Sequence, residues 1–159
     1  MKFGISAAFS DASHLGEMAR AAESAGFERV TLSDHVIQPE RLTTPYPYTD
    51  DGTPRWPPFT DWPDPWVAIG AMAALTERIR FFTSVFVLGM RNPFLVAKTV
   101  GTAAVMSGDR VELGIGAGWM REEFELLGQR FEGRGQRMDE MMDVLRLIWS
   151  GGWVEHQGA

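Results

Sequence analysis

Short apolar segments alternate with segments of helical spacing along almost the whole chain. The apolar segments cover residues 2–6, 29–33, 79–87 and 110–116, and the one at 79–87 is continuously apolar. Continuous apolarity is typical of a parallel strand that is covered on both faces. Repeated strand–helix alternation predicts a parallel α/β sheet, which is either doubly wound or part of an eight-stranded barrel.

Capping signals mark the helices between these strands. Asp64 and Asn92 each precede a proline, and a short polar side chain followed by proline is typical of a helix start. These signals predict helices over residues 65–76 and 93–107. An apolar stripe near the C-terminus predicts a further helix, and residues 153–156 are predicted to open a fifth strand.

Residues 36–64 interrupt this rhythm. Seven of the nine prolines fall here, together with the aromatic residues Tyr46, Tyr48, Trp56, Phe59 and Trp62. A loop of this length inside a compact domain is usually functional or disordered, and aromatic side chains give this one apolar area to bury. The segment is predicted to pack down on the surface, to close over a site as a lid, or to do both.

The composition excludes several classes of protein. The net charge of −6 does not attract phosphate backbones, so nucleic acid is not an expected partner. Cysteine is absent, which excludes disulfides and thiolate metal sites. The most apolar stretch, residues 66–75, is about half as long as a membrane span. We therefore expect a cytoplasmic protein that does not enter the membrane.

Common catalytic motifs are missing from the sequence. The glycine run at 114–119 has Trp119 in place of the third glycine of the dinucleotide fingerprint. The three histidines, His14, His35 and His156, are far apart and show no metal-ligand spacing, so no metal site is predicted.

The candidate site residues instead share a position at the C-terminal ends of the predicted strands. Asp34 and His35 follow the second strand, Ser84 and Val85 lie near the end of the third, and residues 116–119 follow the fourth. Ligands of parallel α/β proteins bind at that edge. His35 is the strongest candidate because an imidazole exchanges protons near neutral pH. The alternative interpretation is a histidine exposed on a loop.

Several motifs occur in a specific order along the chain. They are Met1-Lys2-Phe3-Gly4-Ile5, Leu32-Ser33-Asp34-His35, Glu77-Arg78-Ile79-Arg80, Thr83-Ser84-Val85, Arg91-Asn92-Pro93, the segment 108–119 and Glu122-Glu123-Phe124. In this order the chain resembles the N-terminal half of the luciferase-like family of flavin and deazaflavin oxidoreductases. The segment Tyr46-Pro47-Tyr48 resembles the branch that depends on coenzyme F-420.

The resemblance implies a TIM (β/α)8 barrel, of which residues 1–159 are the N-terminal half of one domain with an insertion at 36–64. A complete barrel has about 250 residues, so the last four βα units are expected to be absent. The family's ring system lies across the C-terminal mouth of the barrel. Helices 65–76 and 93–107 lie on the side through which the family often dimerises, so a homodimer is expected.

By the same resemblance, His35 and Asp34 are the catalytic candidates and contact the ring, with His35 as a proton donor or orienting group. Ser84 and Val85 occupy the place where the family often has a non-proline cis peptide bond against the ring. The remaining cofactor-binding candidates are Gly116, Ala117, Gly118 and Trp119. Some sugar-phosphate-oxidising members have a glutamate where this chain has Trp119, which argues against their specific reaction.

The implied activity is hydride transfer between the deazaflavin coenzyme F-420 and a small organic substrate. One alternative is an FMN-dependent luciferase-like monooxygenase. The other alternative is an inactive half-barrel that only associates with another chain.

Overall fold

Four strands form one parallel sheet in the order in which they occur in the sequence. The computed structural model describes residues 1–158, and the strands are β1 (Gly4–Ser6), β2 (Arg29–Leu32), β3 (Arg80–Thr83) and β5 (Val111–Glu112). Val30 pairs with Ile5 on one side and with Phe81 on the other. The predicted parallel α/β arrangement is confirmed.

A second, two-stranded parallel ladder extends the sheet at its C-terminal end. It consists of β4 (Phe86–Val87) and β6 (Ile115–Gly116). The predictions of unbroken strands over 79–87 and 110–116 are therefore wrong in detail. The first is interrupted at Ser84 and Val85, which are joined by a cis peptide bond.

A side chain bridges the interruption between the two ladders. The Thr83 hydroxyl donates to the Gly114 carbonyl at 2.9 Å and accepts from the Gly114 N–H at 3.0 Å. The threonine side chain thus adds to the backbone bond from the Phe86 N–H to the same Gly114 carbonyl, at the point where both strands are interrupted.

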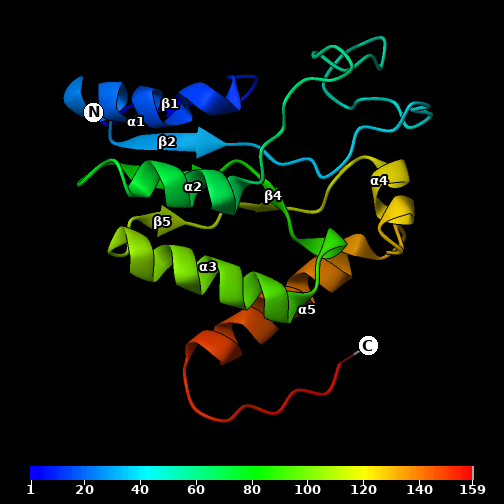
Figure 1. Ribbon diagram of the computed structural model, residues 1–159. Helices are drawn as coiled ribbons and strands as arrows, with labels where there is room; N and C mark the ends of the chain where they lie inside the picture. Colours follow the sequence, from blue (N-terminus) through cyan, green and yellow to red (C-terminus); the bar gives the residue numbers. More distant parts are fainter. Residues whose placement is uncertain (159) are drawn as a thin grey trace.

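Three helices cover one face of the sheet: α1 (Leu15–Ser24), α2 (Pro65–Ala73) and α3 (Pro93–Ser107) (Figure 1). As predicted, Asp64 and Asn92 cap α2 and α3 by accepting hydrogen bonds from backbone N–H groups of the first turn. Helix α2 ends three residues before the predicted Thr76. Beyond this end, the Arg110 guanidinium donates hydrogen bonds to the backbone carbonyls of Ala73, Thr76 and Ile79.

The two faces of the sheet differ in burial. Val30 and Phe81 point toward the helices and are fully buried in the main hydrophobic core. On the opposite face, Phe82 is only partly buried. Glu112 lies on this second face between Arg29 and Arg80 and forms ion pairs with both, at 3.2 and 2.6 Å.

The C-terminal part forms two helices, α4 (Arg121–Leu126) and α5 (Arg134–Trp149), while short 3-10 turns η1 (Ala12–His14) and η2 (Leu88–Met90) precede α1 and α3. The predicted strand at 153–156 is wrong. These residues lie against α5 rather than beside a strand, and His156 Nε2 is 3.2 Å from Glu140 Oε1. A strand needs a neighbouring strand to satisfy its backbone, and the segment has none there.

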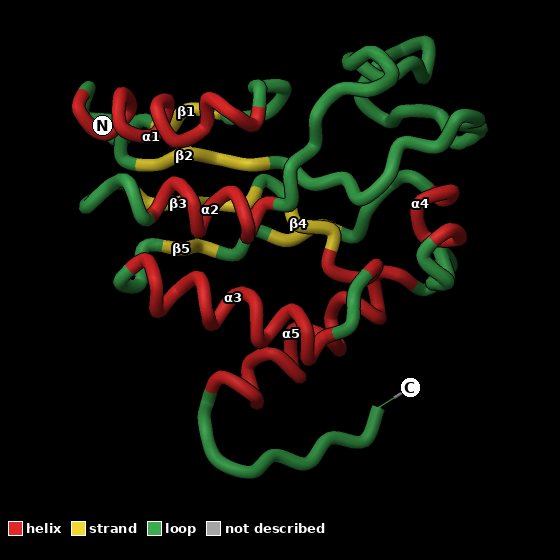
Figure 2. Tube along the Cα trace, in the orientation of Figure 1, coloured by secondary structure: helices red, strands yellow, loops and turns green. Residues whose placement is uncertain are grey.

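Residues 36–64 form a long loop without a helix or strand. The loop and α4 lie together at the end of the sheet toward which the β2 arrow points (Figures 1 and 2). Among residues 1–158, no helix has the length and apolar character that crossing a membrane requires.

Candidate functional site

A cavity of about 550 Å³ lies at the C-terminal ends of the strands. All eight residues that the sequence predicts for the site line it: Asp34, His35, Ser84, Val85, Gly116, Ala117, Gly118 and Trp119. They come from the segments that follow β2 and β3 and from the end of β6 onward, which parallel pairing brings to one edge. The structure thus gathers these residues, while their roles remain predictions.

Three tryptophan rings lie around His35, and two further rings pack against those tryptophans. Together the five form what we call the aromatic wall: Phe9, Tyr46, Trp56, Trp62 and Trp119. The centroid of the His35 ring lies 4.8 Å from that of Trp62, 5.3 Å from Trp56 and 6.0 Å from Trp119. Three of the five rings belong to the 36–64 loop, and they line the cavity. The loop therefore covers the site as well as packing on the surface.

A buried carboxylate from α4 holds His35. Glu123 Oε2 lies 3.0 Å from His35 Nδ1, and its Oε1 accepts from the backbone N–H groups of Val36 and Ile37. The Glu123 side chain is 2% exposed. The sequence alone indicates no role for Glu123, which is part of a family motif. Its contact with His35 joins residues 88 positions apart in the chain, so no local pattern indicates it.

Both carboxylate oxygens of Asp34 bond to groups other than the imidazole. Its Oδ2 accepts from the Val87 N–H at 2.9 Å, and its Oδ1 forms an ion pair with Arg91 at 2.7 Å. Burial raises the pKa of Asp34, and the Arg91 guanidinium and the Val87 N–H oppose that rise. Asp34 therefore ties the end of β2 to β4 and to Arg91, and its catalytic role stays a prediction.

Glu122, the neighbour of Glu123, anchors the same loop at a second point. Its Oε1 accepts from the Thr43 hydroxyl at 2.5 Å and from the N–H groups of Thr43 and Thr44 at 2.7 and 2.9 Å. Burial alone would raise the pKa of Glu122, but the bonds from Thr43 and from backbone N–H groups lower it to about 2. Two adjacent carboxylates thus fix the beginning of the loop.

The glycines of the cavity edge serve close contacts within the protein. A Cβ at Gly116 would collide with the Val85 side chain. At Gly118, where φ is +81°, a Cβ would lie 2.6 Å from Val87 and 2.8 Å from Phe124. Their lack of side chains is therefore explained by packing, whether or not a ligand also approaches them.

The cavity has features that suit a flat ring with polar edges. The apolar side chain of Val85 is 42% exposed beside it. Within the described part of the chain, Ser33 Oγ and Trp62 Nε1 are buried without a hydrogen-bond partner, and both residues line the cavity. No group of three potential metal ligands occurs among residues 1–158. The lining is thus aromatic and apolar, with few polar groups, as a flat organic ring requires.

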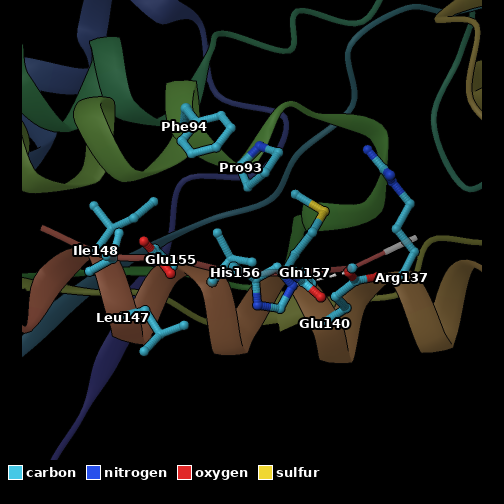
Figure 3. Close-up of a pocket in the computed structure, with 13 residues that line it drawn as sticks. Pro93, Phe94, Arg137, Glu140, Leu147, Ile148, Glu155, His156 and Gln157 are labelled. Carbon is cyan, nitrogen blue, oxygen red and sulfur yellow. Dashed lines mark hydrogen bonds and ion pairs between the residues drawn. The ribbon is translucent and has the colours of Figure 1, made fainter.

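A second hollow has a different character. It lies between α3, α5 and residues 154–158, and Phe94, Leu147 and Ile148 give it apolar walls (Figure 3). It contains none of the residues that the sequence predicts for the site, and it is lined by helices and tail rather than by strand ends. The candidate functional site is therefore the cavity around His35.

Comparison with known proteins agrees with this geometry. The sequence model of the family described as luciferase-like monooxygenase matches residues 1–159. The chain belongs to this family. This confirms the predicted membership of the luciferase-like family. It also confirms the prediction of part of a TIM barrel of the luciferase-like type.

Among similar sequences in this family, an uncharacterized protein of Mycobacterium tuberculosis is 35% identical over 158 residues, which are 99% of this chain and 55% of that protein. An F-420-dependent glucose-6-phosphate dehydrogenase of Tsukamurella paurometabola is 34% identical over 142 residues, covering 86% of this chain and 38% of the enzyme. The chain spans about half the length, or less, of the curated relatives that it matches.

Solved structures of luciferase-like enzymes share the fold. The monooxygenase RslO1 from Streptomyces bottropensis has a TM-score of 0.78 at 23% identity, over 100% of this chain and 46% of that one. An F-420-dependent secondary alcohol dehydrogenase, solved with an F-420–acetone adduct, has a TM-score of 0.75 at 25% identity, over 99% of this chain and 46% of that one.

Proposed function

We propose that the cavity around His35 is part of an active site for hydride transfer between the deazaflavin coenzyme F-420 and a small organic substrate. The observation that carries the proposal is the placement of His35. Its ring lines a cavity at the strand ends, lies among aromatic rings, and is held by a buried carboxylate. The similarity to an F-420-dependent dehydrogenase supports the choice of cofactor.

The residues assigned to the cofactor are those at the interrupted strand ends. Ser84 and Val85 would lie against the ring, while Gly116, Ala117, Gly118 and Trp119 would line the rest of its path. When bound, the deazaflavin accepts or supplies the hydride. The protein holds the ring in place and excludes water by means of the aromatic wall.

His35 would handle the proton that accompanies the hydride. During oxidation of an alcohol, the substrate carbon loses a hydride and its hydroxyl loses a proton, which His35 accepts. During reduction of a carbonyl, His35 returns that proton to the oxygen. Substrate oxidation thus releases two electrons and one proton as hydride, and one further proton to the imidazole.

The lining of the cavity supports an uncharged substrate. None of the residues that line it is a lysine or an arginine. A phosphorylated sugar needs cationic side chains or several N–H donors around its phosphate. This part of the site supplies aromatic rings instead, so we propose an apolar or aromatic alcohol, aldehyde or ketone as the substrate class.

A cofactor titration of the full-length gene product tests the proposal. We expect saturable binding of F-420, which is measured by the change in tryptophan fluorescence. Trp119→Ala should raise the Kd about two- to tenfold, because an aromatic contact contributes about 0.5–1.5 kcal/mol. Trp153→Ala is the matched control, since Trp153 is fully exposed.

The same titration separates the alternatives. Tighter binding of FMN than of F-420 would favour a flavin-dependent monooxygenase. Binding of neither ring would favour a half-barrel that only associates with another chain.

We also propose a homodimer through the outer surfaces of α2 and α3. Val67 on α2 and Leu95 and Val105 on α3 are apolar and largely exposed. Burying such residues against a second copy would remove apolar area from water. Light scattering at high micromolar concentration is expected to give twice the chain mass. A monodisperse monomer would contradict the dimer.

A further inference from the structure

One nitrogen of His35 is already committed to a partner. Nδ1 lies 3.0 Å from Glu123 Oε2, and the two side chains are 12% and 2% exposed. A carboxylate only accepts hydrogen bonds, so Nδ1 must carry the hydrogen in this contact. Among the described residues, no hydrogen bond involves Nε2 of His35, and the His35 ring lines the cavity.

The second oxygen of Glu123 is equally constrained. Oε1 accepts from the backbone N–H groups of Val36 and Ile37. Backbone N–H groups only donate, so this oxygen must remain an acceptor. The two oxygens of one side chain therefore fix the His35 ring and the backbone that directly follows it.

Asp34 is next to His35 in the sequence but cannot replace Glu123. Both of its oxygens are occupied, by the Val87 N–H at 2.9 Å and by Arg91 at 2.7 Å. Orientation of the imidazole thus depends on Glu123 from α4.

We infer that Glu123 is a positioning residue, which fixes the Nδ1–H tautomer of His35 and leaves Nε2 as the nitrogen that exchanges a proton with the substrate. The first half of this inference rests on contacts within the chain, and the second half rests on the proposed function. In the oxidation direction, the hydroxyl proton of the substrate forms a bond to Nε2 as the hydride leaves its carbon. The imidazolium so formed has two N–H groups, and the Glu123 carboxylate stabilises its charge.

An isosteric substitution gives a sharp prediction. In Glu123→Gln, the amide oxygen must face the two N–H groups of Val36 and Ile37. The amide NH2 group then faces His35 Nδ1 and requires a lone pair there. The substitution is therefore expected to move the imidazole hydrogen from Nδ1 to Nε2, which removes the site that would accept a proton.

Nuclear magnetic resonance of the 159-residue chain measures this directly. Long-range ¹H–¹⁵N correlation spectra of neutral His35 report which ring nitrogen carries the hydrogen. The wild-type chain is expected to show the Nδ1–H form and Glu123→Gln the Nε2–H form. Glu122→Gln is the matched control, because Glu122 bonds to Thr43 and Thr44 instead of His35. It should keep the Nδ1–H form.

Two results would overturn the inference: an Nε2–H form in the wild-type chain, or an unchanged Nδ1–H form in Glu123→Gln. An Nε2–H form in the wild-type spectrum would overturn the inference even if Glu123→Gln does not fold.

The spectra contain no cofactor or substrate, so they stand apart from the proposed function. In the full-length gene product, Glu123→Gln should lower turnover about 10²–10⁴-fold at an unchanged Kd for F-420. Wild-type turnover in Glu123→Gln would overturn the catalytic half of the inference. Absence of activity in the wild type would instead overturn the proposed function.

Discussion

The helix-covered sheet and the 36–64 loop are held in place by different forces. Val30 and Phe81 of the sheet are completely buried among apolar side chains. The loop has no helix or strand, and it is fixed by hydrogen bonds to Glu122 and Glu123 and by contacts between aromatic rings. Apolar burial is non-directional and cumulative, whereas the contacts of the loop are few and specific.

This difference suits the two regions to different tasks. The sheet can lose a contact and keep its shape, because many others remain. The loop positions the Trp56 and Trp62 rings beside His35, and it depends on two carboxylates of one short helix. We therefore expect substitutions in the sheet to change global stability, and substitutions in the carboxylate pair to change local order at the site.

The largest effect on stability is expected for Phe81→Ala. Removal of a fully buried phenylalanine typically costs about 3–5 kcal/mol in the free energy of unfolding. Phe82→Ala is the matched control, because the Phe82 side chain points to the other face of the sheet and is only partly buried. Denaturant unfolding of both variants measures the difference. Equal losses would show that the two faces of the sheet are not distinct.

A smaller effect is expected for Gly116→Ala, in which the new Cβ collides with Val85. Overpacking of this kind typically costs about 1–3 kcal/mol. Gly70→Ala in α2 is the control, since nothing lies within 4 Å of the added Cβ. It should stabilise the chain by about 0.5–1 kcal/mol through helix propensity. The midpoint of thermal unfolding should therefore fall for Gly116→Ala and rise for Gly70→Ala. A shift in the same direction for both variants would contradict the close contact at Gly116.

Glu122→Gln should loosen the loop while leaving the global unfolding midpoint almost unchanged. The substitution removes the charge that strengthens the hydrogen bonds from Thr43 and Thr44. Limited proteolysis should cut within 36–64 faster than in the wild type. Unchanged cleavage would show that the aromatic contacts alone hold the loop.

The effect of Glu122 should depend on pH. Its pKa in the folded chain is about 2, below the ordinary 4.5, so its contribution is fully present above pH 4.5 and is lost as the pH falls through 2. The ratio of the pepsin cleavage rate of Glu122→Gln to that of the wild type should exceed one at pH 4.5 and fall toward one as the pH drops to 2. A ratio that is constant over this range would contradict the lowered pKa.

The sequence predicts the sheet far better than the loop contacts. Apolar periodicity and capping residues such as Asp64 and Asn92 are local signals, and the structure confirms the elements that they mark. The position of His35 directly after the second predicted strand also placed it in the predicted site. The contact between His35 and Glu123 spans 88 residues, and no local pattern encodes which acid will reach the imidazole. The breaks in the strands depend on Thr83 and Gly114, whose cross-strand bonds appear only in three dimensions.

The most direct test of the central claim is the turnover of His35→Ala in the full-length gene product with F-420 and a panel of small alcohols, aldehydes and ketones. His14→Ala is the control, because His14 is exposed and does not line the cavity. We predict that His35→Ala lowers kcat about 10²–10⁴-fold and leaves the Kd for F-420 nearly unchanged, while His14→Ala behaves as the wild type. Near wild-type turnover of His35→Ala at saturating substrate would contradict the account and identify His35 as an ordinary loop histidine.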